Sequence, residues 1–400
     1  MSAIRVMYFC GGAANLIAAH RSWRASVQHP TEVSVTFSSQ IQDACESAGC
    51  PTYMISVHPE PRRIEDGLFT IEHRPKKPAA GLAFHIEEFR YVLGLLATAR
   101  KFQASLALVD SGTAHFFLFA IFRLFGIRVV PILHNTLWPT GFYPTRLPQR
   151  LLLGLDAVLF WRWAPSALIS VSPECERQVR RLVADLDYPT LQIRAQFRPD
   201  YFASIPRPRF PTRGTFNVLF IGRVDRSKGV FDILKMARKA NSTVPGRIKW
   251  RICGRGPDLA ALTEMHQELG LETSVELMGW VSLEELQGIY ADTHVCIVPT
   301  RSLFAEGLAM TAAEAVLAGR PLVSNPLVPA TELLAPACMM AQSNDYESHA
   351  DAVIELSRNQ ALYEQLCSAC LGLGDEFLDP RQGLRAAVAR ILDDAQIAGR

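Results

Sequence analysis

Two basic side chains follow an apolar segment in the second half of the chain. The segment FNVLFIG ends at Gly222, and Arg223 and Lys228 come next, five residues apart, before a helical pattern begins. A glycine turn at a strand end lets the backbone approach a ligand, and a helix N-terminus favours phosphate. Arginine binds an anion as a bidentate fork and lysine as a point charge, so this pair suits one diphosphate group. A solvated basic turn is the alternative interpretation.

A second apolar segment runs into a glycine turn in RICGRGPD, which places Gly254 and Gly256 before another helical pattern. The spacing differs from the GxGxxG dinucleotide fingerprint. Both a ligand-approaching loop and ordinary turn chemistry therefore remain open for these two glycines.

Two carboxylates lie eight residues apart in EGLAMTAAEAVLAGRPLV. Glu306 stands where an apolar segment gives way to a helical pattern, and Glu314 lies midway along an alanine-rich helix with an otherwise buried pattern. Eight residues span about two helical turns, so both side chains can face one cleft. Carboxylates suit polyols because their oxygens accept hydroxyl hydrogens. A capping Glu306 and an unrelated surface Glu314 are the alternative.

Short apolar segments alternate with longer helical patterns in both halves of the chain, which predicts parallel sheets in two doubly wound α/β domains. Ligands of such sheets bind beyond the carboxyl ends of the strands, so we expect the active site in a cleft between the domains. The predicted strands are residues 5–10, 32–37, 106–109, 129–133, 167–171, 216–221, 249–253, 275–278, 295–299 and 321–324.

Four prolines between residues 198 and 212 predict the linker between these domains. We expect an N-terminal acceptor-binding domain at 1–198, a linker at 199–215 and a donor-binding domain at 216–380. A final helix at 381–400 is expected to pack back toward the N-terminal domain. Pro173 and Glu174 predict a helix that begins after Ser172.

Composition excludes several classes of protein. The 400 residues are 49% hydrophobic and 20% charged, which is typical of a folded chain of two or three domains. A net charge of +2 without a clustered basic–aromatic patch argues against nucleic-acid binding. Nine scattered cysteines, with a lone CxxC at Cys367 and Cys370, favour a reducing compartment and no metal site. The start MSAIRVMYFCGG predicts a strand rather than a signal peptide, and no transmembrane helix is indicated, so we expect a cytoplasmic protein.

The order of these motifs resembles the donor-binding half of the retaining glycosyltransferases of family four. FIGRVDRSKG, ICGRGP, MGWVSLEELQGIYADTHVCIVPT and EGLAMTAAEAVLAGRPLV carry the resemblance, closely over residues 216–325 and by architecture elsewhere. It implies the GT-B fold, in which two Rossmann-like domains face a central cleft. It also implies transfer of a sugar, with retention, from a UDP- or GDP-linked donor to a carbohydrate or lipid-linked saccharide acceptor. Bacterial surface polysaccharide or glycolipid biosynthesis is the expected setting, with no metal cofactor.

The resemblance also implies roles for individual residues. Arg223 and Lys228 would hold the diphosphate, Glu314 the ribose, and Glu306 the transferred sugar. Glu306, His134, Arg223 and Lys228 are the expected catalytic residues. The other expected donor-site residues are Gly254, Gly256, Trp280, Val281, Gly307, Leu308 and Ala309. In the N-terminal half, Gly11 and Gly12 would approach the donor phosphates and the acceptor, and Asn135 and Trp138 would line the acceptor pocket.

Three departures from the family pattern leave the donor specificity and the hinge open. Leu308 stands where phenylalanine is usual, and PLVPATE at 326–332 replaces a glycine-rich turn before a glutamate. AQFRPDY at 195–201 replaces the usual Asn-Gly of the interdomain turn. A non-catalytic nucleotide-sugar-binding subunit and a nucleotide-sugar epimerase remain alternatives. A phosphorylase would need a pyridoxal-bearing lysine, for which there is no motif.

The first 200 residues carry a net charge of +5 and the rest −3. Residues 151–163, LLLGLDAVLFWRW, are very apolar, and Arg177, Arg180 and Arg181 fall on one helical face. One interpretation is peripheral docking on an anionic membrane. The other, which we expect for residues 151–163, is a buried crossover helix beside a solvated arginine face.

Overall fold

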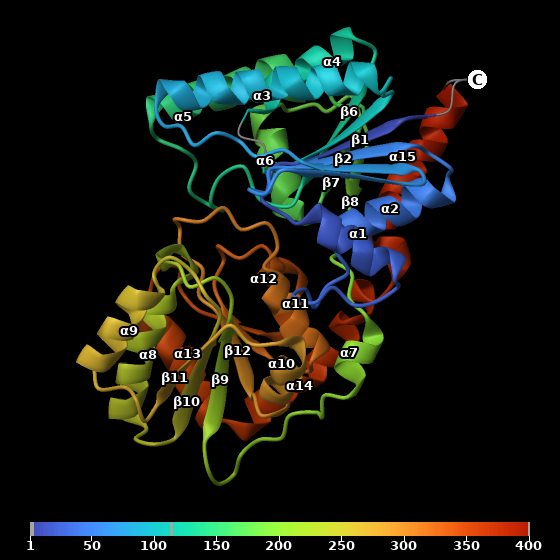
Figure 1. Cartoon of the computed structure of the whole chain (residues 1–400). Helices are drawn as coiled ribbons and strands as arrows, with labels where there is room; N and C mark the ends of the chain where they lie inside the picture. Colours follow the sequence, from blue (N-terminus) through green and yellow to red (C-terminus); the bar gives the residue numbers. More distant parts are fainter. Residues whose placement is uncertain (1–3, 113–114, 399–400) are drawn as a thin grey trace.

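The chain forms two α/β domains joined by a short linker in a computed structural model that describes residues 4–112 and 115–398 (Figure 1). The strands of the first domain are β1 (Val6–Cys10), β2 (Thr52–Ser56), β3 (Arg62–Asp66), β4 (Phe69–His73), β5 (Leu106–Asp110), β6 (Arg128–Leu133), β7 (Leu168–Ser170) and β8 (Thr190–Gln192). Those of the second are β9 (Phe216–Ile221), β10 (Ile248–Cys253), β11 (Val275–Gly279), β12 (Val295–Val298), β13 (Leu322–Ser324) and β14 (Cys338–Met340).

Both sheets have the strand order of doubly wound folds. The first sheet runs β3-β4-β2-β1-β5-β6-β7-β8 and the second β11-β10-β9-β12-β13-β14. All neighbouring strands are parallel except the antiparallel pair β3 and β4. The strand order reverses between β1 and β5 and between β9 and β12, which are the switch points where ligands of such sheets bind. The predicted fold class is confirmed.

Helices cover both faces of each sheet (Figure 1). In the first domain they are α1 (Leu16–Arg24), α2 (Phe37–Ser47), α3 (Leu82–Lys101), η1 (Phe116–Phe119), α4 (Ala120–Leu124), α5 (Leu147–Asp156), η2 (Ala157–Trp161) and α6 (Pro173–Leu182). The linker holds α7 (Pro199–Ala203), and the second domain holds η3 (Arg226–Lys228), α8 (Val230–Thr243), α9 (Leu259–Glu268), α10 (Leu283–Ala291), α11 (Met310–Leu317), α12 (Ala330–Leu333), η4 (Ala335–Ala337), α13 (Tyr346–Arg358) and α14 (Gln360–Leu373). The chain then passes through η5 (Asp375–Phe377) and η6 (Pro380–Gln382) into α15 (Leu384–Ala398).

The two domains share part of their apolar core. One cluster of buried residues extends from the first sheet to the side of the second domain that α10 and α11 form. Phe197 links the two, because its ring contacts Phe202 in the linker and Phe377 near the C-terminus, with centroids 5.9 and 6.4 Å away. After Phe377 the chain returns to the first domain, where α15 packs against α2 (Figure 1).

Two predictions about local structure are wrong. The predicted strand at 32–37 is an extended loop that forms only an isolated bridge from Ser34 to Phe197. Its alternation of apolar residues is cut off at Thr36, whose hydroxyl accepts a hydrogen bond from the Ser39 amide and starts α2. The residues at 151–163 are not a buried helix, because Leu151, Leu155 and Val158 are exposed to solvent on α5 and η2. Asp156 and Phe160 face inward instead.

Candidate functional site

The two predicted cations approach one aromatic ring beyond the carboxyl end of β9. Lys228 Nζ lies 3.9 Å from the ring centroid of Phe304, and the Arg223 guanidinium carbon lies 6.0 Å from it. Both cations come from the β9 side of the switch point, and Phe304 from the loop after β12. Cations favour the face of an aromatic ring, so Phe304 helps to hold them together. Sequence reasoning missed Phe304, although it stands two residues before Glu306.

Lys228 also pairs with the first carboxylate of the motif. Its Nζ lies 2.6 Å from Glu306 Oε2, and the Thr300 hydroxyl donates to the same oxygen at 3.1 Å. Glu306 is only 6% exposed, so its charge needs these partners. The structure therefore brings together Arg223, Lys228 and Glu306 at the β9–β12 switch point.

The turns after β9 and β10 require glycine because their backbones lie too close together for a side chain. A Cβ on Gly254, whose φ is +143°, would lie 1.8 Å from the Gly222 carbonyl oxygen. A Cβ on Gly256 would lie 2.1 Å from that of Val224. These contacts account for both glycines by packing between the loops, and they hold the loops at the carboxyl edge of the sheet.

The segment after β11 joins the same edge. The Gly254 amide donates to the Gly279 carbonyl at 2.6 Å, immediately before Trp280 and Val281. The Trp280 side chain is half exposed and Val281 is half-buried. An indole in this position can stack on a planar ring of a ligand.

Backbone strain marks the start of α11. Ala309 precedes this helix with φ +73° and ψ 87°, a conformation that L-residues rarely adopt and that costs about 1–3 kcal/mol. Leu308 and Ala309 are both buried, and the Leu308 carbonyl accepts from the Ala330 amide at 3.1 Å. The surrounding structure thus fixes the loop that carries Glu306.

Glu314 lies apart from this cluster and has different partners. Its Oε2 accepts a hydrogen bond from the Tyr290 hydroxyl at 3.2 Å, a buried contact between α10 and α11. Burial raises the pKa of Glu314 to about 7; the Tyr290 hydrogen bond lowers it, and the charge of Glu32 from the first domain raises it further. Glu306 and Glu314 share no hydrogen-bond partner among the described residues.

Replacing Glu314 with glutamine is expected to stabilise the ligand-free protein more at pH 8 than at pH 5. The carboxyl binds its proton more tightly in the folded chain than in the unfolded chain, where the pKa is near 4.5. Stability is therefore lost as the pH rises from about 4.5 to about 7, by on the order of 3 kcal/mol for this shift, and glutamine avoids that loss. Thermal unfolding midpoints at both pH values test this. Glu364→Gln, on the exposed side of α14, is the matched control; an equal gain at both pH values would contradict the prediction.

On the first domain, Gly11 lies at the β1–β5 switch point. Its amide donates to Asp110 Oδ1 at 2.8 Å, and the Gly112 amide donates to the same oxygen at 2.9 Å. A Cβ on Gly11 would lie 2.3 Å from the Gly112 carbonyl carbon, so glycine is required there. Gly12 is open, with only the Cys10 sulfur 4.0 Å from its ideal Cβ position. Sequence reasoning missed Asp110, which the VDSG turn after an apolar segment could have indicated.

His134 follows β6 with both ring nitrogens buried and without a hydrogen-bond partner. Its ring stacks on Phe37 at 4.1 Å, and its backbone amide donates to the Ser111 hydroxyl at 3.0 Å. Burial lowers the pKa of His134, so the imidazole is neutral near pH 7. A neutral imidazole offers one donor and one acceptor to a ligand.

The two halves of the site meet at Gly307. A Cβ there would lie 1.7 Å from the His134 carbonyl oxygen and 2.9 Å from Asn135 Cα. The loop that carries Glu306 thus packs directly on the backbone of the β6 loop. A second contact joins α6 and α12, where Arg177 Nη2 lies 2.6 Å from Glu332 Oε2. Glu332, in the segment 326–332 that differs from the family pattern, therefore forms an ion pair between the two domains.

Two other predicted positions serve packing. Trp138 is 2% exposed and contacts the ring of Tyr143, so it does not line an open acceptor pocket as expected. Ser172 precedes α6 but makes no capping hydrogen bond, because its hydroxyl donates to the Cys175 sulfur at 3.3 Å.

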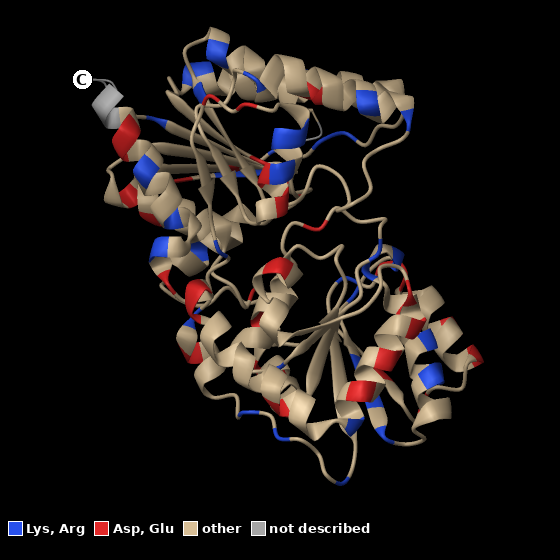
Figure 2. Cartoon of the chain, turned by 180° about the vertical axis from the view of Figure 1, so that it is seen from behind, with Lys and Arg blue, Asp and Glu red and all other residues tan. Residues whose placement is uncertain are grey.

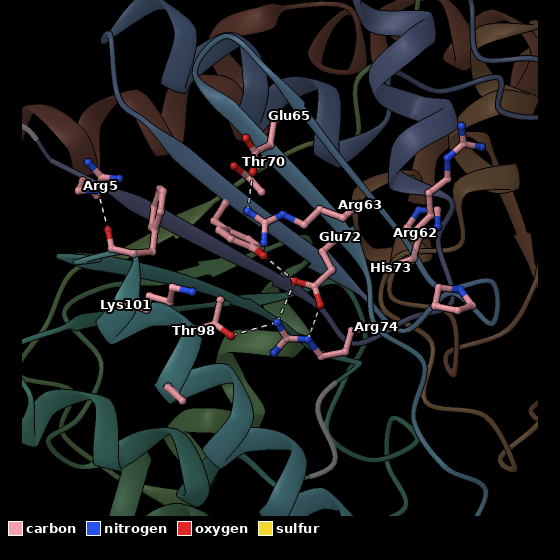
Figure 3. A pocket seen from close by; sticks show the side chains of 14 residues that line it. Arg5, Arg62, Arg63, Glu65, Thr70, Glu72, His73, Arg74, Thr98 and Lys101 are labelled. Atoms are coloured by element: carbon pink, nitrogen blue, oxygen red, sulfur yellow. Dashed lines mark hydrogen bonds and ion pairs between the residues drawn. The ribbon is translucent and has the colours of Figure 1, made fainter.

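A pocket of about 820 Å³ lies away from these residues, at the β3–β4 edge of the first sheet (Figure 3). Several of its charged side chains satisfy one another. Glu72 accepts two hydrogen bonds from Arg74, at 2.7 and 2.8 Å, and one from the Tyr53 hydroxyl at 2.6 Å. The pocket contains none of the predicted site residues.

Within residues 4–112 and 115–398, no three His, Cys, Asp or Glu side chains gather as they would around a metal ion. Of the helices in the same residues, none combines the length and the apolar content that crossing a membrane requires.

Comparison with known proteins shows which fold the chain has and which family its second domain matches. Residues 215–359 match the family described as Glycosyl transferases group 1. No curated protein matches the chain significantly. Among solved structures, sucrose-phosphate synthase from Thermosynechococcus elongatus is 16% identical, with a TM-score of 0.73 over 99% of this chain and 100% of that one.

Two further solved structures are similar. WaaG, a glycosyltransferase involved in lipopolysaccharide biosynthesis, is 11% identical with a TM-score of 0.69 over 97% of this chain and 99% of that one. Anabaena HepE, in complex with UDP and glucose, is 14% identical with a TM-score of 0.67 over 98% of this chain and 100% of that one.

The two facing doubly wound domains and these likenesses define the GT-B fold. Residues 215–359, in the second domain, match the Glycosyl transferases group 1 family, in agreement with the resemblance to family four.

Proposed function

We propose that the protein transfers a sugar from a nucleotide diphosphate-sugar to an acceptor hydroxyl, with retention at the anomeric carbon. The gathering of Arg223, Lys228 and Glu306 at the β9–β12 switch point, with Gly307 packed on the His134 backbone, supports this most directly. The cations suit the leaving diphosphate, and Glu306 and the imidazole suit sugar hydroxyls.

In this reaction the bond from the anomeric carbon to the phosphate oxygen breaks and a bond to the acceptor oxygen forms on the same face. The acceptor proton passes to the leaving phosphate oxygen. Negative charge develops on that diphosphate, and Arg223 and Lys228 stabilise it electrostatically. Lys228, paired with Glu306 in the ligand-free protein, exchanges this partner for the diphosphate, which leaves Glu306 to accept from sugar hydroxyls. Contact between the domains at Gly307 and His134 excludes water from the reacting atoms.

Donor recognition follows from the edge of the second sheet. The backbone around Trp280 and Val281 is the proposed contact of the base, and Glu314 is the proposed partner of the ribose hydroxyls. UDP is the first nucleotide to test, because HepE is in complex with UDP and glucose; GDP is the second. A role in bacterial surface polysaccharide or glycolipid synthesis, at the cytoplasmic face of the inner membrane, is supported by the likeness to WaaG.

Product analysis tests the proposal. The protein is incubated with UDP- and GDP-sugars and a panel of saccharide acceptors, and the anomeric configuration of any product is read by NMR. A product with the configuration of the donor is expected, and a product of inverted configuration would contradict the retaining mechanism. Conversion of the donor without an acceptor would indicate the epimerase alternative.

The reaction is expected to proceed without a divalent cation. Arg223 and Lys228 supply two positive charges at the proposed position of the diphosphate, which is the charge that a metal ion would otherwise provide. Transfer rates with EDTA and with added Mg²⁺ or Mn²⁺ are expected to agree within about twofold. A strict requirement for a divalent ion would overturn this expectation.

A further inference from the structure

The first domain exposes two apolar stripes on neighbouring helices. On α3 the exposed side chains are Leu82, Ile86, Phe89 and Leu93. On α5 and η2 they are Leu147, Leu151, Leu155, Val158 and Leu159. Spacings of three and four residues place each set on one side of its helix. Both helices contact η1, and Figure 1 shows α3 and α5 in one helical layer of the domain.

This layer, which we name the α3–α5 face, also carries exposed aromatic and apolar residues at its margins. They include Phe125 after α4, Phe142 before α5 and Trp163 after η2. Large apolar side chains that are exposed together on neighbouring helices are typical of interaction surfaces. The α3–α5 face therefore requires an occupant.

The charges of the α3–α5 face indicate what that occupant is. The exposed basic residues are Arg90, Arg100, Arg123, Arg146, Arg150 and Arg162, whereas no carboxylate of α3, α4, α5 or η2 is exposed. Glu87 is half-buried and pairs with Arg90, and Glu88 and Asp156 are buried. In Figure 2 this layer is largely tan, with more blue than red along it. An acidic surface complements it, and a second copy of the same face would repel it.

We infer that the α3–α5 face docks on the surface of an anionic lipid bilayer. Amphipathic helices that lie in a membrane interface combine leucine, phenylalanine and tryptophan with arginine and lysine, as this face does. The arginines proposed from the sequence do not contribute in the same way. Arg177 and Arg180 pair with Glu174, Glu176 and Glu332, and Arg181 lies over the ring of Tyr143.

The chain connects this face directly to the site. The segment that leaves β6 at His134 continues through the exposed Phe142 and reaches Leu147 at the start of α5. This segment of chain joins the α3–α5 face to the loop that contributes His134. Together with the proposed transferase function, this favours an acceptor held in the bilayer; docking itself does not depend on that function.

Flotation with vesicles tests the inference without any donor or acceptor. The wild-type protein is expected to float with phosphatidylcholine vesicles that contain phosphatidylglycerol, and far less with phosphatidylcholine alone. Leu151→Glu with Val158→Glu removes the centre of one stripe and is expected to lower partitioning at least about tenfold. Arg146→Glu with Arg150→Glu is expected to do the same, because each basic residue near an anionic surface contributes about fivefold. Binding is expected to persist in part at high salt, which screens the arginines but not the apolar insertion.

Matched controls separate docking from general effects of charge. Leu371→Glu exposes a carboxylate on α14, and Arg207→Glu with Arg213→Glu reverses two exposed arginines of the linker. Both are expected to bind vesicles as the wild type does, and thermal unfolding checks that every variant folds. The inference would be overturned if the wild-type protein did not bind anionic vesicles, or if the control variants lost binding to the same extent as the docking variants. It would also be overturned if the protein were a dimer in solution that Leu151→Glu dissociates. UDP binding, measured separately, is expected to survive in the docking variants.

Discussion

Lys228→Ala is expected to lower kcat/KM by about 10²–10³, the usual loss when one group that stabilises developing charge is removed. Lys228 lies 2.6 Å from Glu306 and 3.9 Å from the centroid of Phe304, at the position proposed for the diphosphate. Initial transfer rates at varied donor concentration measure the effect. Arg223→Ala removes the second cation, and a loss of similar size is expected.

The matched control for Lys228 lies in the same turn. Arg226 is largely exposed and points elsewhere, with its guanidinium 3.6 Å from Asp258 and 4.4 Å from the ring centroid of Phe231. Arg226→Ala is expected to stay within about threefold of the wild type. Lys228→Ala leaves the buried Glu306 without its counter-ion. Thermal unfolding of Lys228→Ala, compared with the double variant Lys228→Ala/Glu306→Gln, therefore checks that the single variant still folds. Equal losses in Arg226→Ala and Lys228→Ala would contradict the assignment.

Gly307→Ala is expected to abolish transfer while leaving nucleotide binding nearly intact. The new Cβ would lie 1.7 Å from the His134 carbonyl oxygen, so the Glu306 loop and the β6 loop must move apart. A displacement of about 1 Å at reacting groups costs about 10²-fold in rate. The residues proposed for the base, the ribose and the two cations at the diphosphate all belong to the second domain, so the Kd for the nucleotide is expected to change by less than about threefold.

Gly372→Ala is the control for Gly307→Ala. It adds the same methyl group to α14, where no atom lies within 4 Å of the new Cβ, and activity is expected to be unchanged. Small-angle scattering distinguishes the two variants, because only Gly307→Ala should enlarge the radius of gyration. A Gly307→Ala protein with wild-type kcat would show that contact between the domains at this point is not needed for transfer.

The second domain was more predictable than the first. Its five predicted strands all exist, because each is a short apolar segment that ends in a turn and precedes a helix. In the first domain β2, β3, β4 and β8 were missed, and in the second only the short β14 was missed. β3 has a largely polar sequence, RRIED, on an exposed edge, where the burial that produces an apolar pattern is absent. Residues 32–37 show the converse error. Their apolar and polar residues alternate as in a strand, but Thr36 caps the helix that follows.

Residue types and spacing indicated the chemistry of the site but not its partners. Arg223 and Lys228 are five residues apart after one predicted strand, and Glu306 follows another, so their proximity could be expected once both strand ends were placed at one sheet edge. Contacts between distant segments could not: Phe304 under the two cations, Tyr290 against Glu314, and Gly307 on His134. Each depends on how helices and domains pack, which the periodicity of one segment does not specify.

The apolar segment at 151–163 illustrates the same limit. Its composition suits a buried helix and a membrane-facing helix equally well. Only the packing shows that Asp156 and Phe160 turn inward while Leu151, Leu155 and Val158 face solvent.

Binding of nucleotides is the most direct test of the account. Thermal unfolding of the wild type and of Arg223→Ala and Glu314→Ala is measured with UDP, GDP, ADP and their sugar conjugates. We predict that one nucleotide raises the Tm of the wild type and that both substitutions abolish the shift, because Arg223 is the proposed partner of the diphosphate and Glu314 that of the ribose. Equal shifts in all three proteins would contradict this donor site. No shift with any nucleotide would mean that the GT-B fold of this chain does not carry the proposed donor site.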